Sequence, residues 1–474
     1  MKILYVAGEA NPFAASGGLG DVMGALPTAI TENSDAISTS VVIPLYDMIK
    51  SEYREKLTRL TDISFKFSWR NTGATVYTTN LNGVDYYFVE NHYYFERGRL
   101  YGEFDDGERF AFFSMAVIEF MLQHGIIPDI LHANDWQAAL SVIYIKTKYA
   151  HVKELSAVKT VYTIHNIEYQ GKFDLAILGD VFALDNKYRS LVEYDGCINL
   201  MKGAIVLSDF VTTVSPNYAN ELRHDYFSFG LSEIIRSAEG KICGIINGID
   251  YSYYSPDVGG DIDYPYTRRA FKSGKAKNKA SLQKELGLKI SQDTPLLSMV
   301  TRLTDGKGID ILLHIIEELL EENIQLVVLG TGDKKYEDAF ISLANKYDNL
   351  VAIMKFDRKL GKKIYAASDI FIMPSKSEPC GLAQMIACSY GAVPVVRAVG
   401  GLYDSIRPHG TEGGCGFVFE NYNAHDLLYT IKDALNLYFN KTEWLALVKK
   451  ALSKDFSWKQ SASKYISIYR KLLN

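Results

Sequence analysis

The sequence predicts an α/β protein made of two doubly wound domains in series. The chain has 474 residues, and a single hydrophobic core stops growing at roughly 250 to 300 residues, so two domains are expected. Short runs of β-branched and apolar residues alternate with longer amphipathic segments, which is typical of parallel strands covered by helices. This alternation occurs twice, on either side of a polar segment that begins near Asn247.

Short apolar runs mark the predicted strands of both series. The first reads KILYVA, STSVVIP, DILHAND, TVYTIHN and DFVTTVSP, and the second reads LLSMVTRL, QLVVLGTG, DIFIMPS, AVPVVRAV and GFVFE. The segment between them, NGIDYSYYSPDVGGDIDYPYTRRAFKSGKAKNK, is rich in Gly, Asp and Tyr and is predicted to be a connector or flexible loop. Helical spacing is clearest in residues 311–322 and 458–473, where apolar residues share one face. The apolar face of the last helix needs a surface to cover.

The overall charge and the cysteines exclude several classes of protein. A net charge of -5 and a pI near 6.0 give no basic field for nucleic acid. The five cysteines are far apart and form no CxxC pair, so they are expected to be reduced thiols without zinc. The first apolar run ends at Ala7, which is too short for a signal peptide, and no later run reaches the ~20 residues of a membrane span. The protein is therefore expected in the cytoplasm.

The segment FAASGGLGDVMGALP follows the first predicted strand. A glycine-rich turn between a strand and a helix lets backbone N–H groups approach an anion such as phosphate. The spacing of Gly17, Gly18 and Gly20 matches neither the dinucleotide nor the P-loop pattern, and the turn contains no Lys. Two interpretations stay open: a ligand-binding turn, or a tight strand-to-helix turn with Asp21 in the first helical turn.

The clearest candidates for chemistry lie at strand ends of the second series. Arg302 and Lys307 lie between a strand and a helix, so two cations and a helix N-terminus are expected together. This pattern predicts an anion site, and the alternative is an exposed pair of basic residues. The next strand ends in GTGD, which adds Gly332 to the same edge. Glu378 precedes another helix, near Gly381, where its carboxylate could bind sugar hydroxyls or cap the helix.

In the first series, HANDWQAAL and TIHNIEYQG place polar residues at two strand ends. The first carries His132 and Asp135, and the second carries His165 and Asn166. A single His is usually structural, but two such strand ends near the glycine turn indicate a candidate site, and no pair has metal-ligand spacing. The sequence is also rich in Tyr and Phe, whose clusters suit either sugar binding or core packing.

These motifs, in this order, resemble the family of bacterial glycogen synthases and plant starch synthases, from Lys2 to about Leu472. The shared segments are SGGLGDVMGALP, HANDWQAAL, TIHNIEYQG, NLMKGAI, TTVSPNYA, INGIDYSYYSPD, TRLTDGKGID, SEPCGLAQM, VGGLYDSI and DFSW. The resemblance implies a GT-B fold, with two Rossmann-like domains facing a central cleft. The expected domains are residues 1–246 and 247–456, and the last helix, within 457–474, is expected to cross back onto the first domain.

The resemblance also implies an activity. The implied enzyme is a retaining glucosyltransferase that adds glucose from ADP-glucose to the non-reducing end of an α-1,4-glucan or glycogen, without a metal or another cofactor. Arg302 and Lys307 would stabilise the diphosphate, and replacing either by Ala is expected to lower turnover with little loss of folding. His165 and Glu378 would hold glucose hydroxyls while the departing phosphate takes the acceptor proton in a front-face attack. No membrane and no nucleic acid are expected as partners.

Further residues are expected to bind substrate, from their strand ends or from the resemblance. They are Ser16, Gly17, Gly18, Asp21, Asp135, Asn166, Asn247, Gly332, Phe356, Cys380, Gly381, Leu382, Gly400 and Gly401. Tyr93, Tyr94 and Phe95 form a candidate surface for the acceptor glucan, with core packing as the equal alternative.

The glycine turn departs from the family's pattern. Ala15 stands where the family commonly has Lys, Ser16 where it has Thr, and Val399 where it has Thr before the paired glycines. The missing cation bears on the choice between ADP-glucose and UDP-glucose. The alternatives are the same transfer from UDP-glucose, a glucan-binding protein without catalysis, and sucrose synthesis, against which the SEPCGL segment and the full-length match argue. Whether the protein is a monomer or a homo-oligomer stays open.

Overall fold

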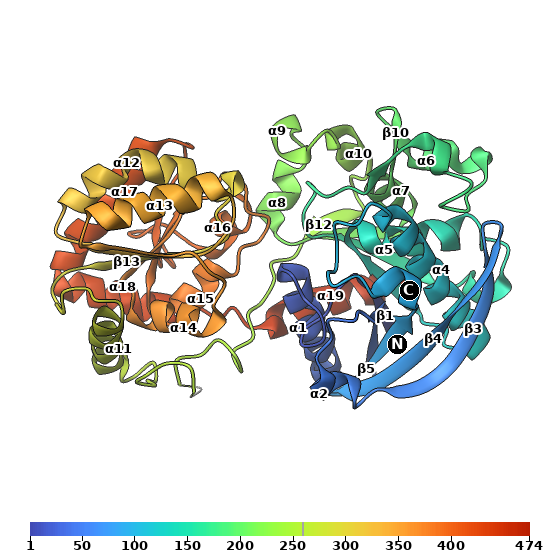
Figure 1. Cartoon of the computed structure of the whole chain (residues 1–474), viewed down its shortest axis with the longest axis horizontal. Helices are drawn as coiled ribbons and strands as arrows, with labels where there is room; N and C mark the ends of the chain where they lie inside the picture. The colour runs from blue at the N-terminus through green and yellow to red at the C-terminus, as the bar shows by residue number, and fades with distance from the viewer. Residues whose placement is uncertain (258–259) are drawn as a thin grey trace. The chain divides into compact units, whose positions relative to one another are not determined.

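The computed structural model describes residues 1–257 and 260–474, and two residues of the predicted connector, Val258 and Gly259, lie outside this part of the chain. The chain forms two compact units. Unit 1 comprises residues 1–214, 219–248 and 458–474, and unit 2 comprises residues 215–218 and 249–457. The chain therefore leaves unit 1 and returns to it, and its last helix belongs to the same unit as its first strand (Figure 1).

Unit 1 contains, among its described residues, a nine-stranded sheet in the order β12-β11-β7-β6-β1-β2-β5-β4-β3. The strands from β12 to β5 run parallel, and β4 and β3 extend the sheet as antiparallel strands. The hairpin of β3 and β4 was absent from the sequence-based prediction, because polar residues interrupt its apolar positions. The strands are β1 Lys2–Val6, β2 Ser38–Pro44, β3 Thr58–Phe67, β4 Arg70–Leu81, β5 Val84–Glu90, β6 Ile130–Asn134, β7 Lys159–Ile164, β11 Phe210–Thr213 and β12 Ile242–Gly244.

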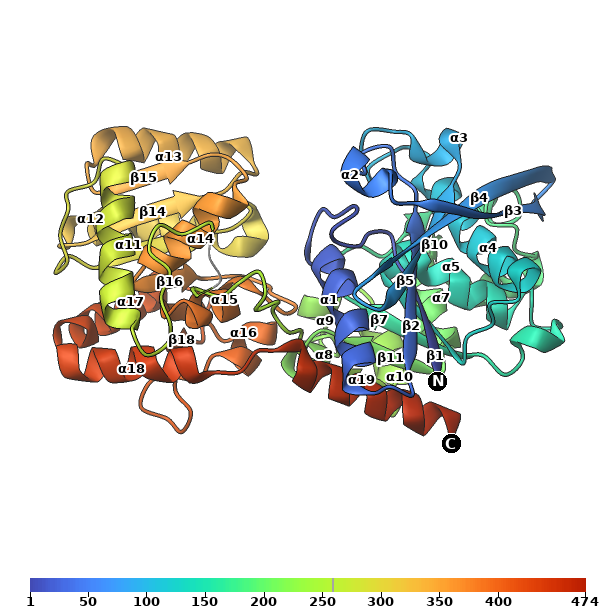
Figure 2. The ribbon, with the colours of Figure 1, turned by 90° about the horizontal axis from the view of Figure 1, so that it is seen from below.

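Helices cover both faces of this sheet. Helices α4, α5 and α7 pack in a row on one face, and α1 and α19 lie side by side on the other (Figure 2). A small sheet in the order β8-β10-β9 follows β7 along the chain. The bounds are α1 Gly18–Asn33, α2 Ser51–Arg54, α3 His92–Phe95, α4 Asp106–His124, α5 Asp135–Lys146, α6 Arg189–Val192, α7 Leu200–Leu207, α8 Pro216–Glu221, α9 Asp225–Ser228, α10 Ser232–Ser237, α19 Trp458–Leu473, β8 Lys172–Phe173, β9 Glu193–Tyr194 and β10 Cys197–Asn199.

The apolar face of α19 covers unit 1. Trp458, Tyr465 and Tyr469 are buried, and the Tyr469 hydroxyl lies 2.9 Å from the hydroxyl of Tyr5 on β1. Burying each aromatic side chain contributes on the order of 2 kcal/mol. The prediction that the last helix returns to the first domain is confirmed.

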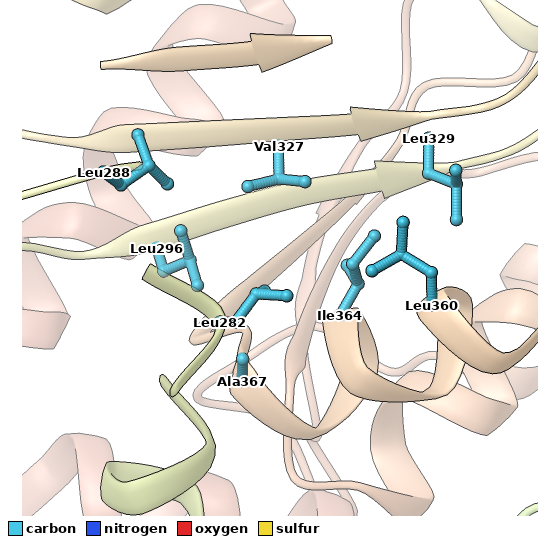
Figure 3. Packing of buried hydrophobic residues seen from close by; sticks show 8 residues of the cluster. All are labelled: Leu282, Leu288, Leu296, Val327, Leu329, Leu360, Ile364 and Ala367. Atoms are coloured by element: carbon cyan, nitrogen blue, oxygen red, sulfur yellow. The ribbon is translucent and has the colours of Figure 1, made fainter. Parts of the chain in front are cut away.

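Unit 2 contains, among its described residues, a six-stranded parallel sheet in the order β15-β14-β13-β16-β17-β18. Leu296, Val327 and Leu329 on the strands pack with Leu282 and Ile364 of two covering helices, α11 and α14 (Figure 3). The bounds are β13 Leu296–Val300, β14 Gln325–Leu329, β15 Leu350–Ile353, β16 Ile370–Met373, β17 Val393–Arg397, β18 Phe417–Phe419, α11 Phe271–Glu285, α12 Ile309–Glu321, α13 Lys334–Lys346, α14 Arg358–Ala367, α15 Ala383–Ser389, α16 Gly400–Ser405, α17 Ala424–Phe439 and α18 Lys441–Ser453.

Helix α11 corrects the sequence-based prediction, because it begins inside the segment that was interpreted as a connector. The buried face of α11 is largely polar, so its sequence lacks the apolar stripe that predicts a helix. The Lys275 ammonium donates to the backbone oxygens of Ala366, Ser368 and Tyr390 at 3.2, 2.7 and 3.2 Å. Those oxygens lie at the ends of α14 and α15, where a cation also complements the helix dipole.

Both sheets bring the predicted site residues to the carboxyl ends of neighbouring strands. In unit 1 these strands are β1, β6 and β7, and in unit 2 they are β13, β14, β16 and β17. Ligands of doubly wound sheets bind beyond such ends. Each unit therefore carries its own group of candidate residues, and a central cleft between the domains stays a prediction.

Candidate active site

His165 directly follows β7, and the end of the neighbouring strand β6 holds it. Its Nε2 atom lies 2.9 Å from Asn134 Oδ1, and its backbone N–H donates to the Asp135 carboxylate over 2.8 Å. The parallel register of β6 and β7, with Asn134 opposite Thr163, brings these groups together. Burial lowers the pKa of His165 to about 3. The imidazole is therefore neutral near pH 7 and can hydrogen-bond a sugar hydroxyl without carrying charge.

Asp135 orders the loop that carries His165. Its carboxylate accepts hydrogen bonds from the backbone N–H groups of His165 and Asn166. Burial raises its pKa to about 7, although these two N–H groups oppose the rise. Its φ angle of 55° lies in the left-handed region, where a non-glycine residue is strained. Strain and a shifted pKa at a strand end are typical of functional positions, so Asp135 stays a candidate site residue.

His132 has a different environment from His165. Its Nδ1 atom lies 2.7 Å from the Tyr469 hydroxyl, and its Nε2 atom lies 2.5 Å from the Thr163 hydroxyl. The side chain is fully buried, and burial lowers its pKa to about 3. Of the two strand-end histidines, His132 is thus a core residue and His165 is the site candidate.

The glycine turn is held by Glu9, which the sequence analysis missed. Its carboxylate accepts the N–H and hydroxyl of Ser16 at 2.5 and 2.8 Å and the N–H of Gly20 at 3.1 Å. The side chain is buried, and this burial raises its pKa. Two N–H groups that could have met a phosphate are therefore already bound to a carboxylate. A lone Glu shortly after an apolar strand is the only sequence signal that could have found it.

The remainder of the turn is open. Gly17 and Gly18 are exposed, and a Cβ atom at either would meet nothing within 4 Å. A Cβ atom at Gly20 would lie 2.4 Å from that of Ala15, so Gly20 serves close packing. Asp21 accepts a hydrogen bond from the Asn11 side chain. The geometry thus combines both interpretations: a tight turn at Gly20 and open space at Gly17 and Gly18.

In unit 2, Lys307 and Glu378 form an ion pair. Lys307 Nζ lies 2.6 Å from Glu378 Oε2, which also accepts from the Ser375 hydroxyl at 3.0 Å. The two side chains are 18% and 8% exposed. Arg302 is exposed, and its guanidinium has no partner in the described part of the chain. The loop after β13 therefore offers one unpaired cation and one that neutralises a carboxylate.

The other unit 2 candidates gather around Glu378 and the strand ends. A Cβ atom at Gly400 would lie 1.9 Å from the Glu378 backbone oxygen, and one at Gly401 would lie 2.1 Å from that of Cys380. The VGG segment thus packs directly on the EPC segment. Cys380 is buried, whereas Gly381 and Leu382 are part-exposed at the start of α15.

Two candidate residues, which follow β14 and β15, differ in whether they are free to contact a ligand. The N–H of Gly332 donates to the Glu337 carboxylate over 2.8 Å, so it is not free for a ligand. The Phe356 ring is 78% exposed, and the Arg358 guanidinium lies 5.8 Å from its centre. An exposed ring beside a cation suits stacking on a flat base.

Two asparagines complete the unit 1 candidates. Asn166 Oδ1 accepts the N–H of Glu168 over 3.0 Å. Asn247 is buried, and its Oδ1 has no hydrogen-bond partner in the described residues. A buried oxygen without a hydrogen bond costs folding free energy. A hydrogen bond donated to Asn247 Oδ1 by a ligand or a water molecule would therefore be stabilising.

Only one of the three residues predicted to form an acceptor surface is exposed. Tyr93 is 65% exposed, whereas Tyr94 is buried and Phe95 fully so. Tyr94 donates its hydroxyl to Glu108 and packs on Phe112. For Tyr94 and Phe95 the core-packing alternative therefore holds, and of the three only Tyr93 stays a candidate for the acceptor surface.

Sequence and structure comparisons identify the family. Residues 2–237 match the model of the starch synthase catalytic domain, and residues 284–445 match that of glycosyl transferases group 1. Glycogen synthases of Streptococcus pneumoniae, from strain JJA and from serotype 4 strain TIGR4, are each 42% identical over 480 aligned residues, covering 100% of both chains. The chain belongs to the glycogen and starch synthase family. The resemblance seen in the sequence is confirmed, and the protein is a glycosyltransferase.

Solved structures agree. The catalytic domain of starch synthase IV from Arabidopsis thaliana, bound to ADP and acarbose, has a TM-score of 0.91 at 33% identity, covering 99% of each chain. A sucrose-phosphate synthase from Thermosynechococcus elongatus has a TM-score of 0.63 at 16% identity, covering 99% of this chain and 98% of its own, and shows the fold alone. The predicted GT-B fold with two Rossmann-like domains is confirmed. Within the described residues, no helix has the length and apolar character needed to cross a membrane.

Proposed function

We propose that this enzyme transfers glucose from ADP-glucose to the non-reducing end of an α-1,4-glucan with retention of configuration. The observation that carries the proposal is the unpaired Arg302 guanidinium in the same loop as Lys307, at the end of β13. A diphosphate leaving group develops negative charge, and preorganised cations at a strand end and helix start stabilise it. The relatives' name, glycogen synthase, supports a glucan as the acceptor, and the ADP in the starch synthase IV structure supports an adenine nucleotide as the donor.

The exposed Phe356 ring is the proposed contact for the adenine. It lies just after β15 and next to Arg358, so the base would stack on the ring while its diphosphate extends toward the β13 loop. Base-to-aromatic stacking contributes on the order of 1 to 3 kcal/mol. It does not depend strongly on the base, so the choice between ADP-glucose and UDP-glucose has to come from other contacts.

Retention requires the acceptor to attack from the face that the diphosphate leaves, or a double displacement through a carboxylate. Glu378 is already paired with Lys307 and hydrogen-bonded to Ser375, which suits holding a sugar hydroxyl better than attacking a carbon. We therefore favour front-face attack. The bond between C1 and the phosphate oxygen breaks, the acceptor O4 bonds to C1, and the O4 proton moves to a phosphate oxygen. The chain needs only to position both substrates and stabilise the charges.

In unit 1, His165 is proposed to hold a hydroxyl of the transferred glucose, and Asp135 to keep its loop in place. A neutral imidazole at that point adds no positive charge beside the oxocarbenium-like sugar. Tyr93, Asp21 and Asn247 are proposed to contact the acceptor or the sugar. Gly17 and Gly18, whose surroundings are open, are proposed to face the donor's sugar and distal phosphate.

The same transfer from UDP-glucose is the second candidate, and it is raised by Ala15, which changes the contacts that the family commonly makes to the donor beside the glycine turn. The cation common in the family is missing beside the glycine turn, and Glu9 adds a buried carboxylate there. A turn with this charge balance attracts a diphosphate less strongly. Catalysis lost altogether is the further alternative, in which the protein would only bind glucan.

The test is transfer of labelled glucose from ADP-glucose and, in parallel, UDP-glucose onto glycogen by the purified enzyme. Glu378→Ala serves as the inactive control, and Ala15→Lys restores the family's cation. Preference for ADP-glucose, with an anomeric proton signal of an α-linked product, supports the proposal. A preference for UDP-glucose that reverses in Ala15→Lys would mean that the glycine turn determines which nucleotide sugar is used. No transfer from either donor, with glycogen still bound, favours the glucan-binding alternative.

A further inference from the structure

Asn134, the last residue of β6, has a fixed amide orientation. It is 1% exposed, and its side-chain nitrogen donates to the backbone oxygens of Val6 and His132 at 3.3 and 3.1 Å. The reverse orientation would place the amide oxygen against two acceptors. The atom that lies 2.9 Å from His165 Nε2 is therefore the amide oxygen.

This contact determines which nitrogen of His165 carries the proton. An amide oxygen only accepts hydrogen bonds, so Nε2 must be the protonated nitrogen. The ring is neutral near pH 7 because burial lowers its pKa to about 3, so Nδ1 is unprotonated. Nδ1 has no hydrogen-bond partner in the described part of the chain, and the residue is part-exposed. His165 thus presents an acceptor, and not a donor, to a ligand.

We propose that Asn134 is a positioning residue that fixes His165 in its Nε2–H tautomer and so makes Nδ1 the hydrogen-bond acceptor for a hydroxyl of the transferred sugar. The sugar's part in this statement rests on the proposed function, whereas the tautomer does not. That sugar hydroxyl must donate its proton to Nδ1, and its oxygen stays available to accept from another group. A donor sugar with fluorine at that carbon cannot make the contact, since fluorine has no proton to donate.

The spectroscopic test uses the full-length enzyme labelled with nitrogen-15 at histidine, and His165→Gln identifies the His165 signals. In the wild type near pH 7, the expected spectrum has a protonated Nε2 and an unprotonated Nδ1. Asn134→Asp is expected to keep this tautomer in its protonated form, because its O–H can donate to a backbone oxygen that the amide contacted while its other oxygen still accepts from Nε2–H, and Asn134→Leu loses it. Thr163→Val is the matched control, since it removes a buried hydroxyl from β7 and leaves the contact between Asn134 and His165 intact.

Two spectroscopic outcomes overturn the proposal: a protonated Nδ1 in the wild type, or an unchanged tautomer in Asn134→Leu. Should Asn134→Leu fail to fold, the wild-type and Asn134→Asp spectra still decide the matter. These spectra need no substrate, so they separate this proposal from the proposed function. An enzyme with the expected tautomer but without glucose transfer contradicts the function alone.

The kinetic test adds the sugar. Asn134→Leu is expected to lower kcat/KM for the donor about tenfold, the loss of one hydrogen bond to an aligned group, and Asn134→Asp to recover most of it. Donors with fluorine at one carbon at a time identify the hydroxyl: at one position the wild type loses about tenfold and Asn134→Leu loses little more. Equal fluorine penalties in both enzymes at every position contradict the sugar contact.

Discussion

At the scale of single residues, the proposed chemistry depends on contacts between groups far apart in the sequence. Lys307 and Glu378 are separated by 71 positions, yet their charged atoms lie 2.6 Å apart. Arg302, in the same loop as Lys307, is exposed and unpaired in the described residues. The two cations that the sequence predicted as equivalent therefore have different energetic roles. One is free for a ligand, and the other also stabilises the folded chain.

Arg302→Ala is expected to lower kcat by about 10²- to 10³-fold, because a preorganised cation on the leaving group is lost. The free energy of unfolding should change by no more than about 0.5 kcal/mol, as for other exposed residues. Steady-state kinetics and urea unfolding measure both effects. Arg59→Ala, an exposed residue of β3, is the matched control. A kcat equal to the wild type's would remove Arg302 from the diphosphate site.

Lys307→Ala is expected to lower kcat and also to destabilise the fold, which corrects the sequence-based expectation of little loss of folding. It leaves the Glu378 carboxylate, 8% exposed, without its cation. Losing one partner of a buried pair costs about 3 to 5 kcal/mol, and the 18% exposure of Lys307 favours the lower end.

The matched measurement is urea unfolding of Lys307→Ala, Lys449→Ala and the double variant Lys307→Ala, Glu378→Gln. The exposed Lys449 should show no effect, and the double variant should recover part of the stability because no uncompensated charge remains. Equal stability of the single and double variants would argue against the pair as described.

His132 predicts a pH dependence of stability. Its folded-state pKa is about 3, against an ordinary value of 6.5. Between these values the unfolded chain binds more protons, so the free energy of unfolding falls as the pH falls from about 6.5 toward 3. The neutral His132 thus contributes stability above pH 6.5 that is lost in acid, about 2 kcal/mol of it at pH 5.

The measurement compares His132→Gln with the wild type by urea unfolding at pH 7 and pH 5. The destabilisation caused by the substitution should be about 2 kcal/mol smaller at pH 5. His151→Gln, at an exposed site, should show the same difference at both pH values. A His132→Gln penalty independent of pH would mean that His132 is not buried as a neutral ring.

At the scale of elements, the glycine turn depends on an exact fit between Ala15 and Gly20. A Cβ atom at Gly20 would lie 2.4 Å from the Ala15 Cβ, so Gly20→Ala is expected to cost about 1 to 3 kcal/mol and to shift the turn. Adding Ala15→Gly removes the colliding atom and should recover most of this loss. Thermal unfolding of the two single variants and the double variant measures the coupling, and strictly additive effects would contradict the contact.

Strands and site loops were predictable to the extent that their signals are local. KILYVA, DILHAND and LLSMV are short apolar runs, and they form β1, β6 and β13, with Asp135 and Arg302 just beyond their ends. Helix α11 was missed because its buried face carries Lys275, whose partners lie far along the chain. Glu9 and Asn134 were missed for the same reason, because each acts through a contact that forms only when the sheet has folded.

The aromatic segment around Tyr93 shows a different limit. Tyr93, Tyr94 and Phe95 are alike in sequence, and their one-turn helix α3 turns the first outward and the other two into the core. For these three residues the sequence left an acceptor surface and core packing as equal alternatives, and the fold buries Tyr94 and Phe95 and leaves Tyr93 exposed. A periodicity argument fails here because the helix is too short to show a face.

At the scale of the whole molecule, the chain is interleaved between its two units. Unit 1 needs residues 458–474 from the far end of the sequence, and unit 2 takes residues 215–218 from within the first half. The Tyr469 hydroxyl contacts both Tyr5 and His132, so α19 belongs to the core that it covers. Neither unit is a simple continuous piece of sequence.

A fragment of residues 1–248 is therefore expected not to unfold cooperatively, because the face beneath α19 stays uncovered. Joining residues 458–474 to it through a flexible Gly/Ser linker should restore a cooperative thermal transition, since the linked helix finds its surface at high effective concentration. A linked helix carrying Tyr465→Ser and Tyr469→Ser is the control and should not restore it. Cooperative unfolding of residues 1–248 alone would show that α19 is dispensable for the core.

The return of α19 to β1 also sets the order in which the chain can mature during translation. Every residue of unit 2 leaves the ribosome before α19 does, so the second unit can close while the first still has an uncovered apolar face. A product that stops before residue 458 retains that face and presents it to chaperones and proteases. In the order of translation, the face that α19 covers is therefore covered only after the residues of unit 2 have been made.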